Sequence, residues 1–376
     1  MEFLEEKRRW WRKKALTADL YRSAVTDYAE LVHANYVDAL AAAGLLESEL
    51  QLFIADPQPE RFEKVRQTWI EARRPWLQTE AFRFSGGPID QVDGSEDLID
   101  GPLAAPRQID YVAGERLSGI INQPQEYPKI TKELLLSLAD SENDEAIATG
   151  WHAIEFLLWG EDRNLDGPGK RPWTDFTKRR NADRRAVYLL TSADLLTDQL
   201  TALVEAWAPD REKNYRAQWN SKPSASALAL VRGLGKLCGE ELAEQRLLDA
   251  WSSRSPVAQP SPFSDTSHQD VIFDVLGIDN VYRGSYRRSD GTIVEGSGIR
   301  TLVAGLLPDR LDAFDSALER AITTALAIPV PFDQGVRSGE NSPARAAVDE
   351  AAEALHQVAM LMADLEQAIR QDLGES

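Results

Sequence analysis

A histidine and a glutamate three residues apart form the clearest candidate for chemistry in this sequence. They are His152 and Glu155, within the segment GWHAIEFLLW. Residues at this spacing lie on the same face of a helix, so the imidazole and the carboxylate can bind one metal ion together, as paired Glu and His side chains do inside carboxylate-bridged bundles. An ordinary hydrogen bond is the alternative. The apolar residues around the pair favour a buried position, where both groups need a metal ion or a hydrogen-bond partner.

Hydrolase motifs are missing around this pair. A thermolysin-like site reads His-Glu-x-x-His, and its inverted form reads His-x-x-Glu-His. Neither motif occurs in the sequence. In the segment around His152, Phe156 stands where the inverted form needs its second histidine. The sequence also lacks Gly-x-Ser-x-Gly, and its one cysteine, Cys238, lies in an apolar stretch typical of a small core residue. A peptidase would need metal ligands from distant segments.

The turn after this helix has the pattern of half a calcium-binding loop. Residues 162–167 read DRNLDG, with oxygen donors at alternate positions and glycine sixth. The twelfth position of such a loop needs glutamate, and Trp173 stands there. This excludes a complete EF-hand, and the pattern predicts a tight polar turn.

Composition limits the partners of the chain. Its 376 residues are 43% hydrophobic and 27% charged, an ordinary globular composition that suits two domains. The formal net charge of -19 repels nucleic acid and anionic lipid, so cations are the favoured partners. We expect no transmembrane helix, because no run of roughly 18 apolar residues occurs. The first residues also lack the apolar core of a signal peptide.

Apolar residues spaced by three and four predict a chain built almost entirely of α-helices. We expect an all-α fold of two four-helix bundles, with an N-terminal domain over 16–175 and a C-terminal domain over 176–376. The C-terminal domain is expected to contain a long irregular connector over 253–298. This connector is expected to include a short helix near 265–276 and the little extended structure that the chain has. Helices are expected over 16–55, 59–79, 143–159, 180–207, 224–252, 299–328 and 343–373, with shorter pieces over 107–138. A Gly- and Pro-rich, acidic loop is expected over 85–106.

Four segments carry a family resemblance: TEAFRFSGGPID at 79–90, GWHAIEFLLWGED at 150–162, FSDTSHQD at 263–270 followed by VLGIDNVYRGSY, and Pro331-Phe332-Asp333. They resemble the imelysin family, in the family's order and over nearly the whole chain. The resemblance implies two helical bundles, with the Gly-x-His-x-x-Glu signature facing the cleft between them. It also implies a bacterial envelope protein, periplasmic or associated with the outer membrane, that is often linked to iron uptake; some members are described as peptidases.

These matched segments supply the remaining candidate site residues. An imidazole with carboxylates suits iron or zinc. Arg83 could orient Glu80 or hold an anion, and a structural ion pair between the two is the equal alternative. The candidate metal ligands are His152, Glu155, Glu80 and His268, with Asp265 or Asp270 as further donors. The candidate ligand-binding residues are Arg83, Asp90, Ser264, Asp265 and Asp333.

The favoured hypothesis is an envelope metal-binding protein linked to iron acquisition, with a divalent iron or zinc ion at the inter-bundle cleft. Its expected partners are that ion or a small ligand, and an envelope iron-transport component. One alternative is a metallopeptidase of the imelysin type. The other is a protein that binds polysaccharide or another anionic ligand in the same cleft. An open coordination position would favour hydrolysis, and a closed set of ligands would favour binding.

Overall fold

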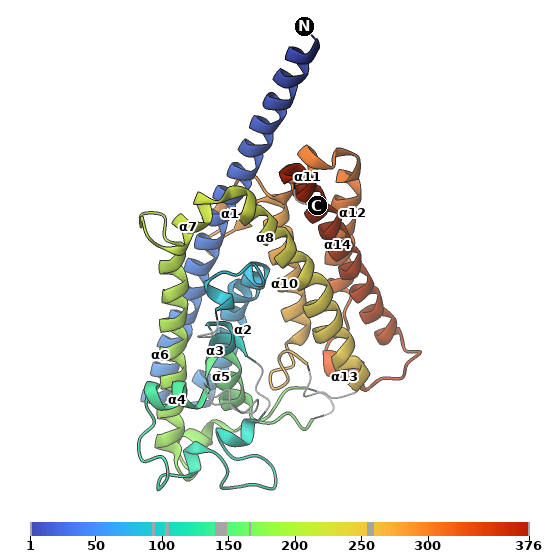
Figure 1. Ribbon diagram of the computed structural model, residues 1–376. Helices are drawn as coiled ribbons and strands as arrows, with labels where there is room; N and C mark the ends of the chain where they lie inside the picture. The colour runs from blue at the N-terminus through green and yellow to red at the C-terminus, as the bar shows by residue number, and fades with distance from the viewer. Residues whose placement is uncertain are drawn as a thin grey trace.

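The computed structural model shows a molecule made almost entirely of helices (Figure 1). It describes residues 2–91, 95–101, 105–139, 149–164, 167–253 and 259–374. The strands in these ranges form a single two-stranded hairpin, so the predicted all-α fold is confirmed. No helix within the described ranges combines the length and the apolar character needed to cross a bilayer.

The long first helix, α1, organises one group of helices. Its apolar stripe, which includes Val25, Val32 and Tyr36, is fully buried because α2 and α6 pack along it. Helix α6 in turn packs against α3, α4 and α5. The group therefore encloses α5, the helix that carries His152. Its members are α1 (Glu2–Ala55), α2 (Pro59–Leu77), α3 (Ser95–Asp100), α4 (Lys132–Ala139), α5 (Gly150–Trp159) and α6 (Ala182–Trp207).

The last helix, α14, organises a second group. Its apolar residues from Val348 to Ile369 are buried at spacings of three and four, because α8, η6 and α12 pack against it. Its predicted bounds, 343–373, are confirmed. The predicted helix over 224–252 is also present, but its middle part, η6, winds as a π-helix. The members are α8 (Pro223–Lys236), η6 (Leu237–Asp249), α9 (Ala250–Ser253), α10 (Ser267–Arg283), α12 (Leu311–Leu326) and α14 (Pro343–Leu373).

Short elements connect the two groups and close their ends. Three of them are α-helices: α7 (Tyr215–Ser221), α11 (Ile299–Leu306) and α13 (Phe332–Arg337). Single turns of 3-10 helix are η1 (Gln78–Phe82), η2 (Pro88–Asp90), η3 (Pro106–Gln108), η4 (Ile120–Asn122), η5 (Trp173–Phe176) and η8 (Pro308–Arg310).

The two groups meet along α1 and along α10. Helix α1 also packs against α8 and α11, and α10 packs against α2 and η1. In Figure 1, α2, α3 and α5 lie between α6 on one side and α10 on the other. The division into domains at residues 175 and 176 stays a prediction. Helix α6, which follows that boundary, packs with the first group.

The predicted connector over 253–298 is more ordered than expected, and the short helix predicted near 265–276 is present but longer. Residues 267–283 form the full-length helix α10, and β1 (Ser285–Arg287) pairs antiparallel with β2 (Ile293–Glu295). Among the described residues, the paired strands β1 and β2 lie in this region, as predicted. The spacing of apolar residues understated α10 because two acidic residues, Asp270 and Asp274, share its buried face with Val271 and Val275.

Other predicted segments also differ from the structure. The helix predicted over 299–328 is divided into α11 and α12 by the turn η8. Over 107–138 the chain forms η3, η4 and the start of α4, with turns between them, since prolines interrupt this stretch. The loop expected after residue 85 contains α3. Helix α5 begins at Gly150; its predicted start near Asn143 lies outside the described residues.

A substitution at Gly277 can test the close contact between α10 and the end of α2. A Cβ atom there would lie 2.3 Å from the Gln78 carbonyl oxygen, and backbone cannot give way as a flexible side chain can. We expect Gly277→Ala to lower the free energy of unfolding by about 1–3 kcal/mol. Gly44→Ala is the matched control, because no atom lies within 4 Å of the new methyl group and alanine favours helix by up to about 1 kcal/mol. Denaturant unfolding measures both; equal effects would contradict this contact.

Candidate functional site

A glycine brings α5 against the short helix α3. Gly150 has a positive φ of 74°, and a Cβ atom at this position would lie 2.3 Å from the carbonyl oxygen of Ile99. Glycine permits both the backbone conformation and the close approach. Asp100, the residue after Ile99, consequently lies beside the first turn of α5 and His152.

His152 is held between two carboxylates. Its Nδ1 lies 2.8 Å from Oε2 of Glu155, and its Nε2 lies 3.2 Å from Oδ1 of Asp100. The side chain is buried, and burial alone would lower the pKa of the imidazole. Asp100 and Glu155 outweigh that effect and raise the pKa of His152 to about 9. The ring is therefore an imidazolium near neutral pH, with both nitrogens donating.

Glu155 joins α5 to the loop before α10. Its Oε1 accepts hydrogen bonds from the backbone N–H groups of Phe263 and Ser264, at 3.1 and 2.8 Å, and from the Ser264 hydroxyl at 2.6 Å. Oε2 faces His152. Both oxygens of this fully buried carboxylate are therefore partnered. The structure thus brings three predicted site residues, His152, Glu155 and Ser264, into one network.

Asp100 continues the network toward α2 and α10. It accepts hydrogen bonds from the Arg73 guanidinium and, at 2.7 Å, from Nε1 of Trp76. Burial opposes ionisation of Asp100, but Arg73 and His152 outweigh it and hold its pKa well below the usual range. Arg73 also reaches Asp270 at 3.3 Å. Burial raises the pKa of Asp270, against the effect of Arg73.

Glu80 and Arg83 belong to a neighbouring buried ion cluster. Glu80 Oε2 lies 2.8 Å from Arg83 and 2.5 Å from Arg246, which also reaches Asp274 at 3.2 Å. Burial opposes ionisation of Glu80, but Arg246 and Arg83 lower its pKa. The described partners of Glu80 are thus arginines from its own turn and from η6. This geometry matches the structural ion pair considered from the sequence.

Two further predicted residues have other contacts. Asp90 accepts backbone N–H groups from Phe84, Gly86 and Gly87, at 2.7–3.1 Å, and so closes the SGGPID loop. His268 lies in the first turn of α10, where burial lowers its pKa against the effect of Asp270. Its Nδ1 is buried without a hydrogen-bond partner among the described residues.

Asp265 and Asp333 meet each other and a third aspartate. Asp265, Asp333 and Asp162 each present a carboxylate oxygen within 4.8 Å of the others. Burial, together with Asp333 and Asp162, raises the pKa of Asp265 to about 7. Asp265 also has a positive φ of 59°, a conformation that aspartate tolerates better than most residues.

Several residues of these networks escaped the sequence analysis. Asp100 is one acidic residue in a segment expected to be a loop, so no spacing singled it out. Arg246 lies in the π-helix, where the 3.6-residue period fails. Arg73 did carry a signal: it lies between Trp69 and Trp76 on the apolar face of α2 and is 3% exposed, and a charge on such a face needs a buried partner.

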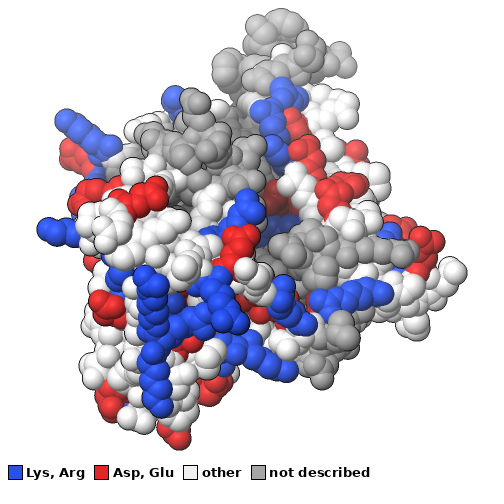
Figure 2. Space-filling model, turned by 90° about the horizontal axis from the view of Figure 1, so that it is seen from below, with Lys and Arg blue, Asp and Glu red and all other residues white. Residues whose placement is uncertain are grey.

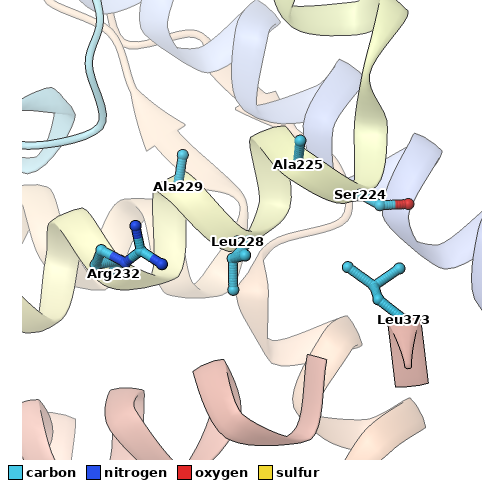
Figure 3. A pocket seen from close by; sticks show the side chains of 6 residues that line it. All are labelled: Ser224, Ala225, Leu228, Ala229, Arg232 and Leu373. Carbon is cyan, nitrogen blue, oxygen red and sulfur yellow. The ribbon is translucent and has the colours of Figure 1, made fainter. Parts of the chain in front are cut away.

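Two hollows on the described surface differ in chemistry. Between α8 and the end of α14 (Figure 3) is a groove of about 360 Å³ whose lining contains no carboxylate or imidazole; the residues are Ser224, Ala225, Leu228, Ala229, Arg232 and Leu373. A second hollow of about 260 Å³, beyond α5, is lined by Tyr111, Arg163 and Lys170 among others. Figure 2 shows Lys and Arg gathered on one face of this acidic chain. Glu161 also lines the second hollow, so its lining carries charges of both signs.

The raised pKa of His152 predicts a pH-dependent stability. The pKa of His152 rises from about 6.5 in the unfolded chain to about 9 in the folded protein, so protonation of the ring stabilises the fold. This contribution to the free energy of unfolding is complete below pH 6.5 and is lost as pH rises through 9. Its size is on the order of 3 kcal/mol. We expect the stability difference between wild type and His152→Gln to shrink by that order between pH 6.5 and 9.5, measured by denaturant unfolding. Parallel curves for the two proteins would refute the buried imidazolium.

Comparison with known proteins supports one family. The family model of Imelysin (Peptidase M75) matches residues 32–362. Iron-regulated protein A of Synechococcus elongatus is 25% identical over 319 residues, which cover 82% of this chain and 76% of the relative.

Solved structures show the same fold. A protein of Parabacteroides distasonis, named as an iron-regulated protein A precursor, superposes with a TM-score of 0.70 at 16% identity, over 93% of this chain and 95% of that one. An imelysin-like protein of Psychrobacter arcticum gives a TM-score of 0.63 at 15% identity, over 95% and 96%. Because the family model covers most of the sequence, this chain belongs to the imelysin family.

Proposed function

We propose that this protein is a bacterial envelope metal-binding protein linked to iron acquisition, with its site at His152, Glu155 and Asp100. The observation that carries the proposal is a buried imidazole with a carboxylate at each ring nitrogen. One nitrogen with carboxylate oxygens is a donor set that suits iron or zinc. The names of the relatives, iron-regulated protein A and its precursor, support the link to iron and to the envelope.

The two carboxylates would have different parts in binding. Metal-binding histidines usually donate their second N–H to a carboxylate, which fixes the ring. Glu155 is in that position, because it accepts from Nδ1 and is itself held by the loop at residues 263–264. Nε2 and Asp100 are then the pair that would hold the ion. Asp270 offers Arg73 a second acceptor, so Arg73 can keep a partner when the ion takes Asp100.

The same geometry argues against the metallopeptidase alternative. Hydrolysis by a metal-bound water needs an open coordination position and a free general base. Both oxygens of Glu155 already accept hydrogen bonds. His152 is 5% exposed, which leaves little access for a polypeptide substrate. Binding requires only that a small ion reach Nε2.

Metal binding at His152 should be coupled to loss of its proton. We expect one Fe²⁺ or Zn²⁺ per chain in calorimetric titrations, with affinity that rises by roughly tenfold per pH unit up to about pH 9, because the imidazolium must deprotonate. His152→Gln should lose at least about tenfold in affinity. His356→Gln is the matched control, because its ring lies on α14 and pairs with Glu244. Equal affinity in the two variants would place the metal elsewhere.

A second measurement separates binding from hydrolysis. We expect no peptide release from a denatured protein substrate, with or without added Zn²⁺, because Glu155 is not a free base. His152→Gln serves as the control for contaminating proteases. Turnover by the wild type that disappears in this variant would establish the hydrolase and defeat the binding proposal.

A further inference from the structure

Three aspartates from distant parts of the chain converge at one point. Asp162 follows α5, Asp265 precedes α10, and Asp333 lies in the first turn of α13. Each offers a carboxylate oxygen within 4.8 Å of the other two. Among the described residues, these three carboxylates lie close enough together to hold one metal ion. His152 and Glu155 are not members of this cluster.

Among the described residues, five of the six carboxylate oxygens of this cluster are buried without a hydrogen-bond partner. Asp265 is 7% exposed, and neither of its carboxylate oxygens has a hydrogen-bond partner among the described residues. Asp333 is 1% exposed and also accepts no hydrogen bond there; its one described ion pair is with Arg337 at 3.4 Å. Asp162 accepts two bonds from Asn164 on Oδ1, while its buried Oδ2 has none. Buried carboxylates without donors require a proton or a cation.

We propose that Asp162, Asp265 and Asp333 form a second metal site, which binds a hard divalent cation of the calcium type. The donors are all oxygens, the ligands that such cations prefer. Oxygens on one Ca²⁺ ion at roughly 2.3–2.6 Å can be up to about 5 Å apart, and the 4.8 Å limit of the cluster falls within that span. The site is separate from the proposed iron or zinc site at His152.

The fold positions the three ligands from both sides. Glu155 holds the backbone at Phe263 and Ser264, immediately before Asp265. On the other side, Nη1 of Arg337 donates to the Asn164 carbonyl at 3.0 Å, which ties α13 to the turn that carries Asp162. The bound cation would therefore join the end of α5, the loop before α10 and the start of α13.

The cluster also accounts for the partial calcium-loop pattern at 162–167. Asp162 is the first residue of that pattern, and the glutamate that would complete it is missing because Trp173 stands at position twelve. Asp265 and Asp333 supply carboxylates from elsewhere in the chain. Asn164, the third residue, instead turns its amide to Asp162 and to the Pro168 carbonyl.

The test is a calorimetric titration of CaCl₂ into the full chain, stripped with chelator, at pH 8. We expect one Ca²⁺ per chain and a higher melting temperature with Ca²⁺. Asp265→Asn and Asp333→Asn should each weaken binding by at least about tenfold. Asp309→Asn removes the same charge at an exposed position and should bind like the wild type. In chelator, the cluster variants should melt no lower than the wild type, because they remove like charges; a merely structural role would lower their melting temperature.

A wild type that binds no Ca²⁺, or cluster variants that bind like Asp309→Asn, would overturn the second site. Zn²⁺ titration distinguishes this failure from failure of the proposed function. Ca²⁺ binding without Zn²⁺ binding at His152 would leave the second site standing and refute the first. Zn²⁺ binding that His152→Gln removes, together with no Ca²⁺ binding, would support the site at His152 and refute the second site.

Discussion

The structure depends on burying charged groups where its two helix groups meet, and on the pairing that makes this burial tolerable. The central link is the Glu155 carboxylate, which accepts from the His152 ring on one oxygen and from the 263–264 loop on the other. A buried carboxylate without donors would be strongly destabilising. Helix α5 and the segment that leads into α10 are therefore fixed to each other by a requirement for hydrogen bonds, in addition to apolar packing.

The pairing extends across the junction as two arginine-centred clusters. Arg73 joins Asp100 to Asp270, and Arg246 joins Glu80 to Asp274. Each arginine thus connects an acid from the first helix group or the segment after α2 with an acid on α10. Removing one partner of such a buried pair is strongly destabilising, so an arrangement that left one of these charges unpaired would be disfavoured.

The Asp162 cluster contrasts with these satisfied networks. In the His152 network each carboxylate oxygen has a donor, whereas the oxygens of Asp265 and Asp333 have no hydrogen-bond donor among the described residues. In the His152 network an entering ion must displace the proton on the imidazole, so binding there is linked to pH. A cluster of like charges attracts an ion. Two metal sites in one chain would therefore differ in chemistry: one couples binding to histidine deprotonation, and the other relies on oxygen ligands alone.

Sequence alone determined the helical class, because burying one face of a helix requires apolar residues at spacings of three and four; the match between the predicted and observed α14 shows this. It also singled out His152 and Glu155, whose contact depends on spacing within one helix. Only the tertiary structure decided which acids and arginines face them. Asp100, Arg73 and Asp162 reach their partners across segments far apart in the chain, and the sequence does not reveal such contacts because no local period connects them. For the same reason α10 was understated: its acidic residues are buried by partners on other helices.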